Sequence, residues 1–227
     1  MSLPNLTSIE EEVIAKSAAE GMESLTRVPT IQNVVATFCL GVDNVNLYYL
    51  ATKAGFVDYN PSKFAAATIR LHTPRTTALV FASGNIVCTG AKTELQSRLA
   101  SRMCARLLQK IGLNVMFKNF SIQNIVASAS AGYPVKLREM ASEHTQASSY
   151  EPELFPGLIY RQTDPKIVFL VFRSGKIVIT GARSNTVLFD NFYKFRNTVL
   201  IHYRDHFDLT TSSSMYRRSG KRLKTRD

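Results

Sequence analysis

The feature that most constrains this chain is an internal repeat, because many of its residues return 91 positions further along. The six residues that start at Ile31 return, with a single conservative change, from Ile122. Further pairs keep the same offset: Tyr59 and Tyr150, Pro61 and Pro152, Phe64 and Phe155, Arg70 and Arg161, Pro74 and Pro165, and Leu79-Val80-Phe81 and Leu170-Val171-Phe172. Two copies of one unit are predicted to form a body with pseudo-two-fold symmetry, which suits a ligand that is itself nearly two-fold symmetric, such as duplex DNA.

Each copy is predicted to be rich in strands and to end in a long helix. In the first copy we expect strands over 31–40, 64–71, 76–82 and 85–89, a short helix over 44–53 and a tight turn at Ser83-Gly84. Long helices are expected over 93–111 and about 186–199. Strand-rich halves that close with helices predict an α+β fold, in which an antiparallel sheet has helices on one face and leaves the other bare.

The helix expected over 93–111 has two stripes of residues that recur every four positions. One is apolar and is predicted to pack on the sheet; it consists of Leu95, Leu99, Met103 and Leu107. The other is basic and is predicted to face away from the sheet; it consists of Arg98, Arg102, Arg106 and Lys110. Four like charges on one stripe repel one another, so we expect this face to meet an acidic protein partner or DNA that flanks a bent site.

Charge and composition favour a globular protein with a polyanionic partner. Of the net charge of +11, the tail beyond residue 205 contributes +4, because it has six basic residues against two acids, and this leaves +7 on the body. The alternative is a soluble protein that happens to be basic. Cys39, Cys88 and Cys104 form no CxxC and have no ligand spacing with histidines, so we expect a reducing compartment, no metal and no cofactor. The sequence also predicts neither a membrane span nor a secretory signal.

The bare face of the sheet is predicted to mix apolar side chains with hydrogen-bonding ones. Val35, Val87, Val126 and Val178 lie two positions from Asn33, Thr89, Asn124 and Thr180, so each pair shares a face. A·T-rich minor grooves fit such a surface, because their sugar edges are apolar and their bases present acceptors. Another subunit covering this face is an equally good interpretation at this point.

Four stretches resemble the core of the TATA-box-binding protein family: residues 59–66, 74–79, 149–161 and 174–182. The resemblance runs from about Ile31 to Tyr203. It implies a saddle in which two pseudo-symmetric repeats form one curved, ten-stranded antiparallel sheet that is concave toward DNA, with four helices on the convex face. The implied organisation is a short N-terminal extension (1–30), a first repeat (31–117), a second repeat (118–205) and a basic C-terminal tail that we expect to be disordered (206–227). That tail could serve nuclear import, contact DNA nonspecifically or be inert.

The resemblance also implies roles for individual residues. Four phenylalanines match wedges that enter base steps: Phe64, Phe81, Phe155 and Phe172. Ten residues match the minor-groove surface: Asn33, Val35, Leu79, Val87, Thr89, Asn124, Val126, Leu170, Val178 and Thr180. Five cations are candidates for phosphate contacts: Arg70, Lys92, Arg161, Lys176 and Arg183. A solvated charged face is the plainer interpretation of the cations.

Protein partners are implied as well. Glu151, Glu153 and Leu154 match the loop that contacts general transcription factor IIB. The basic stripe at 98–110 would meet a factor IIA-like protein or a histone-fold repressor, and TBP-associated factors are further expected partners. Residues 55–58 and His72 depart from the family pattern at the edge used by factor IIA, which puts that contact in doubt, and Asn85 replaces a usual lysine.

The implied function is a nuclear, non-enzymatic general transcription factor that binds A·T-rich promoter DNA, kinks it and nucleates the pre-initiation complex. A divergent member of the family with altered DNA preference or specialised promoters is the alternative. An enzyme is disfavoured, because the sequence has no P-loop and no catalytic triad pattern.

Overall fold

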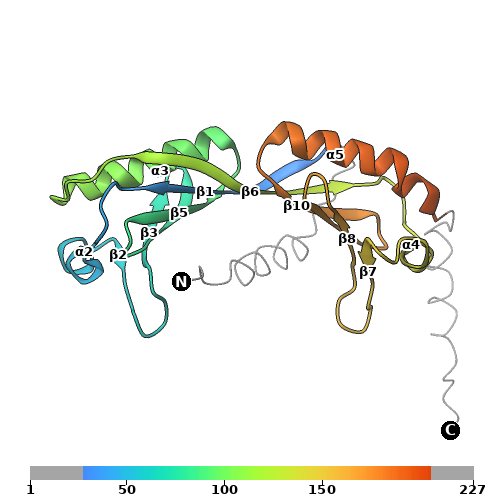
Figure 1. Cartoon of the computed structure of the whole chain (residues 1–227), viewed down its shortest axis with the longest axis horizontal. Coiled ribbons are helices and arrows are strands. Elements are labelled where there is room, and N and C mark those ends of the chain that lie inside the picture. Colours follow the sequence, from blue (N-terminus) through green and yellow to red (C-terminus); the bar gives the residue numbers. More distant parts are fainter. Residues whose placement is uncertain (1–27, 206–227) are drawn as a thin grey trace, which may run out of the picture.

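The structure is a computed structural model that describes residues 28–205, and its two repeats form one saddle (Figure 1). A single ten-stranded sheet spans the molecule in the order β2-β3-β4-β5-β1-β6-β10-β9-β8-β7. The first repeat contains β1 (Thr30–Cys39), β2 (Val57–Asp58), β3 (Ala67–His72), β4 (Arg75–Val80) and β5 (Asn85–Ala91). The second contains β6 (Lys118–Ser130), β7 (Ser148–Ser149), β8 (Leu158–Gln162), β9 (Ile167–Val171) and β10 (Lys176–Ala182). The predicted α+β saddle is confirmed.

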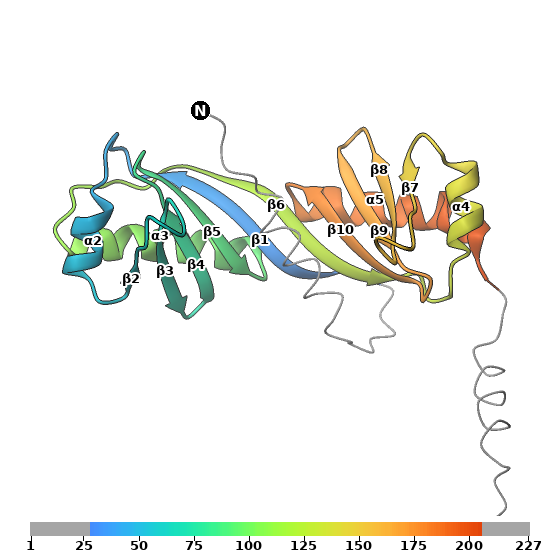
Figure 2. The same cartoon turned by 90° about the horizontal axis from the view of Figure 1, so that it is seen from below.

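The repeats join through β1 and β6, which pair antiparallel at the centre of the sheet (Figure 2). Their register places Asn33 opposite Val126 and Val35 opposite Asn124, so each repeat contributes the same two residue types to the centre. The pairing slips at three points along β1, between residues 31 and 33, 35 and 36, and 37 and 39. Such irregularities increase local twist and bend a strand, which fits the strong curvature of the saddle.

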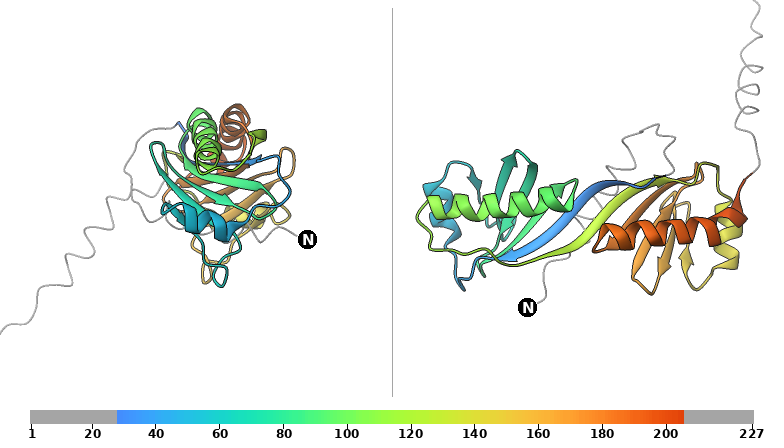
Figure 3. Two further views of the ribbon diagram at one scale, coloured as in Figure 1. Left: turned by 90° about the vertical axis from the view of Figure 1, so that its left-hand side faces the viewer. Right: turned by 90° about the horizontal axis from the view of Figure 1, so that it is seen from above.

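Within residues 28–205, the two long helices cover the convex face of the sheet. The long helices α3 (Glu94–Lys110) and α5 (Asn185–Thr198) lie across that face, while α2 (Leu47–Lys53) and α4 (Leu137–Glu143) lie near the two ends (Figure 3). The backbone N–H of Asn185 donates to Glu94 Oε1 at 3.0 Å, so the N-terminal ends of α3 and α5 are in contact. The predicted long helices are confirmed to within a residue at their ends, and the expected short helix begins at Leu47 rather than at residue 44.

Two hydrophobic cores lie between the sheet and the helices, one centred on each repeat. In the first repeat Phe38, Leu50, Ile69 and Leu108 are buried in one cluster. The second cluster is larger and includes Val34, Ile125, Met140, Phe169 and Phe192. Side chains that belong to these clusters point to the convex side, so their neighbours along each strand point to the concave side.

The prediction for the buried face of α3 is wrong. Leu95, Leu99 and Met103 are exposed, and Leu107 is only partly buried. The face on the sheet consists instead of small residues and one leucine: Ser97, Ala100, Ser101, Cys104, Ala105 and Leu108. These residues have helical spacing of their own, and all of them except Leu108 are small. Burial raises the pKa of the Cys104 thiol to about 12, so this cysteine is a neutral packing residue.

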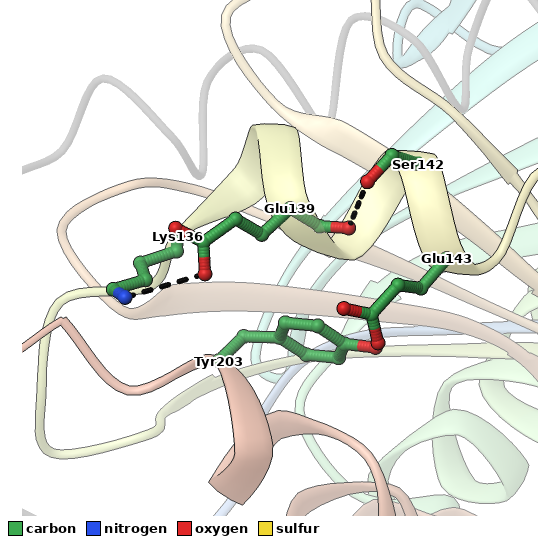
Figure 4. Close-up of polar contacts among 5 residues, drawn as sticks. All are labelled: Lys136, Glu139, Ser142, Glu143 and Tyr203. Atoms are coloured by element: carbon green, nitrogen blue, oxygen red, sulfur yellow. Dashed lines mark hydrogen bonds and ion pairs between the residues drawn. The ribbon is translucent and has the colours of Figure 1, made fainter.

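The end of the second repeat is closed by a polar clamp between α4 and the 3-10 helix η1 (Leu200–Tyr203) (Figure 4). The Tyr203 hydroxyl donates to Glu143 Oε2 at 2.6 Å, and burial together with this contact raises the pKa of Tyr203 to about 12. At the start of α4, Lys136 Nζ lies 3.2 Å from Glu139 Oε2. The clamp holds η1 against α4.

Some predictions concern segments that the structure leaves undescribed. The basic tail and nearly all of the predicted N-terminal extension lie outside residues 28–205. Within that range, no helix combines the length and the apolar character needed to cross a membrane.

Candidate nucleic-acid interface

The centre of the concave face has two matching asparagine sites. Gly90 N–H donates to Asn33 Oδ1 at 2.7 Å, and Asn33 Nδ2 donates to Thr89 Oγ1 at 3.0 Å. In the second repeat, Gly181 N–H donates to Asn124 Oδ1 at 2.8 Å, and Asn124 Nδ2 donates to Thr180 Oγ1 at 2.9 Å. Both amide oxygens are thus held by backbone, which fixes the orientation of each NH₂ group beside a threonine hydroxyl.

Apolar side chains form the floor on either side of these sites. Leu79 is paired with Val87 on the neighbouring strand in the first repeat, and Leu170 is paired with Val178 in the second. The predicted floor residues therefore do lie on one face, together with the central Val35 and Val126. Most of them are buried, so the floor is less exposed than the sequence suggests.

The four phenylalanines are more accessible than most of the floor, because Phe64 is exposed and the other three are half-buried, and they meet in two pairs near the ends of the face. Phe64 and Phe81 have ring centroids 6.3 Å apart at an interplanar angle of 65°, and the Phe64 side chain is 36% exposed. Phe155 and Phe172 lie 5.8 Å apart at 63°. Neither pair belongs to the two convex cores. Phe64 precedes β3 rather than lying within the predicted strand, because the turn that begins at Asn60 positions it.

Tight hairpin turns position the second member of each pair. Phe81 N–H donates to Asn85 O at 3.0 Å and Gly84 N–H returns to Phe81 O at 3.0 Å; Phe172, Gly175 and Lys176 repeat this pattern. Gly84 and Gly175 have φ of +77° and +82°, and a Cβ on either would lie 2.0 Å from a backbone oxygen. The predicted turn at Ser83-Gly84 is confirmed, and it requires glycine.

The packing of the two phenylalanine pairs differs at a third glycine, Gly157. A Cβ at Gly157 would lie 2.7 Å from Phe155 Cε1 and 3.1 Å from Phe172 Cε1. At the 91-residue offset, the first repeat has Ala66 at this position. The second pair therefore closes over a glycine, whereas the first repeat has an alanine at the corresponding position and a wider ring separation.

The candidate phosphate-binding cations are all exposed. Arg70, Arg161 and Lys176 alternate with core residues on their strands, so they share the concave face. Lys92 and Arg183 follow β5 and β10 at equivalent positions. Arg70 Nη1 lies 3.7 Å from Asp58 Oδ2, but both side chains are largely solvent-exposed, so this ion pair is weak and leaves Arg70 available to an anion.

Strand alternation also identifies concave residues that the sequence interpretation missed. Arg75 is the first residue of β4, and Lys166 immediately precedes β9. Each lies an even number of residues from a concave leucine, Leu79 or Leu170, which places both cations on the concave side. The row beside Leu79 contains Thr68, and the row beside Leu170 contains Ile159. The alternating spacing of the strands is the signal that could have located all of these residues.

Among residues 28–205, only the second repeat has a separate cluster of buried apolar residues on its concave face. Val126, Leu170 and Val178 are its buried members, and Phe155, Ile159, Val168 and Phe172 pack against them. In the first repeat Thr68 and Thr77 replace Ile159 and Val168 at the 91-residue offset. The phenylalanines of the second repeat therefore lie on a continuous apolar surface, while those of the first border on hydroxyl groups.

The predicted protein-binding residues lie away from the floor. Glu151, Glu153 and Leu154 are exposed on the loop between β7 and β8, and Leu154 is 81% exposed. This loop and its counterpart between β2 and β3 extend below the sheet at opposite ends of the saddle (Figure 1). Arg98, Arg102, Arg106 and Lys110 are exposed on α3, on the convex side.

Comparison with known proteins agrees with this geometry. The model of the family described as transcription factor TFIID (or TATA-binding protein, TBP) matches residues 28–111 and 119–200. The TATA-box-binding protein of Saccharomyces cerevisiae is 49% identical over 193 residues, which cover 83% of this chain and 80% of that protein. TATA-box-binding protein 1 of Triticum aestivum is 51% identical over 180 residues, covering 78% of this chain and 75% of that one.

Two further comparisons define the extent of the likeness. TATA box-binding protein-like 2 of Takifugu rubripes is 50% identical over 165 residues, and the chain spans about half of that relative's length (51%). The solved structure of Methanococcus jannaschii TBP superposes with a TM-score of 0.67 at 36% identity and covers 76% of this chain and 98% of that one.

Proposed function

The chain belongs to the TATA-binding protein family of DNA-binding transcription factors, and we propose that its concave face binds and bends the minor groove of A·T-rich promoter DNA. It is a general transcription factor of this family, since relatives that share about half of its residues are TATA-box-binding proteins. Its proposed task is to nucleate assembly of the pre-initiation complex in the nucleus, without enzymatic activity of its own.

The observation that supports the proposal best is the symmetric pattern on the concave face. Two asparagine–threonine pairs flank the centre, and a phenylalanine pair lies toward each end. A duplex has a matching near-two-fold axis, so both halves can act on it in the same way. Proteins that bend DNA through the minor groove, this family among them, insert apolar side chains between base steps.

The energetics are consistent with four phenylalanine wedges. Unstacking costs a few kcal/mol per base step. Burial contributes about 25 cal/mol for each Å² of apolar surface, so a few hundred Å² would offset the kinks before other costs of association. The buried floor contributes less of this than the rings, since most of its side chains are already covered by neighbours.

Base preference would come from the centre. Asn33, Asn124, Thr89 and Thr180 are polar groups placed to meet the acceptors of A·T pairs. A guanine would direct its exocyclic amino group at Val35 or Val126, where the floor provides no acceptor. The proposed phosphate contacts of Arg70, Lys92, Arg161, Lys176 and Arg183 would add affinity but little specificity.

Protein partners are proposed for the surfaces that DNA leaves free. Glu151, Glu153 and Leu154 would bind a factor IIB-like protein, because acidic side chains avoid phosphates and Leu154 is almost fully exposed. Arg98, Arg102, Arg106 and Lys110 would bind an acidic surface, such as that of a factor IIA-like protein or a histone-fold repressor. If they neutralise phosphates of flanking DNA instead, reversing Arg102 and Arg106 would lower the slope of log affinity against log salt by about 0.9 for each phosphate that is no longer neutralised.

The test of the DNA proposal measures bending by energy transfer between labels at the ends of a short A·T-rich duplex. We expect Phe155→Ala with Phe172→Ala to reduce the bend, while circular dichroism shows that the fold persists. A matched duplex with central G·C pairs should bind more weakly to the parent protein. An unchanged bend with binding intact would contradict the wedge role, and equal binding of both duplexes would contradict the proposed base preference.

A further inference from the structure

Helix α3 presents an apolar stripe to solvent on the convex side of the first repeat. The side chains of Leu95, Leu99 and Met103 are 78%, 51% and 37% exposed, and they follow one another at intervals of four residues. Residues at this interval are neighbours on a helix surface, so they form one strip along the first three turns. This strip is the α3 stripe.

The second repeat shows that the fold does not need apolar residues there. At the 91-residue offset, α5 has Thr186, Asp190 and Lys194 in place of Leu95, Leu99 and Met103, and all three are exposed. Both helices bury their opposite faces in the same way. The α3 stripe is therefore a property of one repeat alone, and packing within the saddle does not account for it.

Cations border the stripe along one side. The Arg98 and Arg102 guanidinium carbons lie 5.4 Å and 5.8 Å from the ring centroids of Phe120 and Phe117, which hold both side chains beside the helix. Arg106 follows one turn later and bonds to the neutral Gln109 at 3.1 Å. Between residues 28 and 205, no carboxylate forms an ion pair with these three arginines. An occupant of this face should therefore combine apolar and acidic side chains.

The chain contains one segment with that composition. Residues 8–25 carry five glutamates against one lysine, together with Ile9, Val13, Ile14, Met22 and Leu25. They precede β1, and α3 packs against β1. Since β1 has 10 residues, its first residue lies at most about 33 Å from the part of the strand that α3 contacts. The 14 residues between Ile14 and Val28 can span up to about 46 Å, so the segment can reach the stripe.

We propose that residues 8–25 dock in cis on the exposed face of α3, with their apolar side chains on Leu95, Leu99 and Met103 and their glutamates toward Arg98, Arg102 and Arg106. The docked segment covers the face on which we also proposed an acidic partner, so partner and segment compete for it. The docking surface shares residues with that proposed contact, but the docking itself needs neither partner nor DNA. Acidic partners would have to displace the segment before they bind α3.

The experiment uses the full chain, which contains no tryptophan, so a single Ile14→Trp substitution gives a unique fluorescent reporter. Tethering gives an effective concentration in the mM range, so a contact of about 0.1 mM affinity would be populated in roughly nine of ten molecules. We expect blue-shifted emission and severalfold weaker quenching by acrylamide than in the same chain with Leu95→Lys and Met103→Lys. Molar salt should weaken the protection, and a Met22→Trp reporter should behave alike.

The matched control places two lysines on the other long helix, as Thr186→Lys and Asp190→Lys, and should leave the reporter protected. Equal quenching in the parent and the stripe variant would overturn the proposal. Protection that grows with protein concentration would overturn it in favour of a second copy as the occupant. Protection that survives the stripe substitutions but is lost with Phe155→Ala and Phe172→Ala would place the segment on the concave face, which also overturns it.

Discussion

The two repeats share a fold but differ in the chemistry of corresponding surfaces. On the concave face, Ile159 and Val168 of the second repeat join an apolar cluster, whereas Thr68 and Thr77 of the first do not. On the convex face the difference is reversed, because α3 exposes leucine and methionine where α5 exposes polar residues. The convex cores fix the fold in both halves, and the exposed positions on either side are free to differ.

These differences make the two ends of a nearly symmetric molecule distinguishable. A symmetric saddle could sit on a duplex in either orientation with equal free energy. With a more apolar second half and an acidic loop only at that end, the two orientations differ in both DNA contact and partner placement. Each prediction below removes one of these differences or transfers it to the other repeat.

The largest expected effect concerns the two loops that extend below the sheet. The second has Glu151 and Glu153, while the first has Asn60 and Ser62 at the same offset and carries Lys63. We expect Glu151→Arg with Glu153→Arg to abolish recruitment of a factor IIB-like protein in a gel-shift assay while DNA binding persists. Lys63→Glu in the opposite loop is the control and should leave recruitment intact. A normal supershift with both charges reversed would refute the assigned role.

The next effect concerns the concave apolar cluster. Ile159→Thr with Val168→Thr gives the second repeat the residues of the first, and removes about three methyl or methylene groups from the surface around Phe155 and Phe172. At about 0.8 kcal/mol for each buried group, the affinity for an A·T-rich duplex should fall by roughly 50-fold. The reciprocal change, Thr68→Ile with Thr77→Val, should raise it. Equal and small effects from both exchanges would show that the asymmetry has no role in binding.

A smaller effect is expected at Gly157, where the first repeat has Ala66. Gly157→Ala adds a methyl group where a Cβ would lie 2.7 Å from the Phe155 ring, so the ring must move. Such crowding costs at least about 1 kcal/mol, and an affinity loss of roughly fivefold should follow if the cost appears in binding. Titration of end-labelled duplex measures it, with Ala66→Gly as the matched change. An unaltered affinity and bend would mean that ring placement tolerates this shift.

The smallest effect concerns stability at the end of the second repeat. Tyr203 bonds to Glu143, whereas the first repeat has Gly112 at the corresponding offset. Tyr203→Phe removes a bond to an exposed carboxylate, which we expect to cost about 1 kcal/mol and to lower Tm by roughly 2–4 °C. Thermal melts followed by circular dichroism measure this shift.

The same variant has a defined pH dependence. The pKa of Tyr203 is raised to about 12 in the folded protein, above the value of about 10 in an unfolded chain. Its stabilising contribution is therefore complete below pH 10 and is lost as the pH rises through 12. The difference in Tm between the parent and Tyr203→Phe should shrink over that range. A constant difference would mean that the hydroxyl proton is not part of the clamp.

Much of the fold and part of the site followed from the sequence. The repeat offset predicted the pseudo-symmetry, and the spacing of two between Asn33 and Val35 correctly placed both on one face. The buried face of α3 is mispredicted, because apolar periodicity selects the large side chains, whereas the face that α3 buries consists mostly of serine, alanine and cysteine. The concave cluster in one repeat also escaped prediction, since it depends on how neighbouring strands align Ile159 with Leu170. The individual DNA and partner contacts stay predictions.

The separation of the hydrophobic interior into two cores has a mechanical consequence. Each core binds one long helix and one short helix to its part of the sheet as a stiff block. The blocks are linked by the β1–β6 ladder, by the contact of Asn185 with Glu94, and by Val34 and Ala91 of the first repeat, which belong to the second core. Twisting or splaying one block against the other therefore strains this narrow seam rather than the centre of either core. We expect the saddle to have one soft deformation mode, which lets its two ends adjust their separation and relative twist to the helical phase of the duplex beneath them.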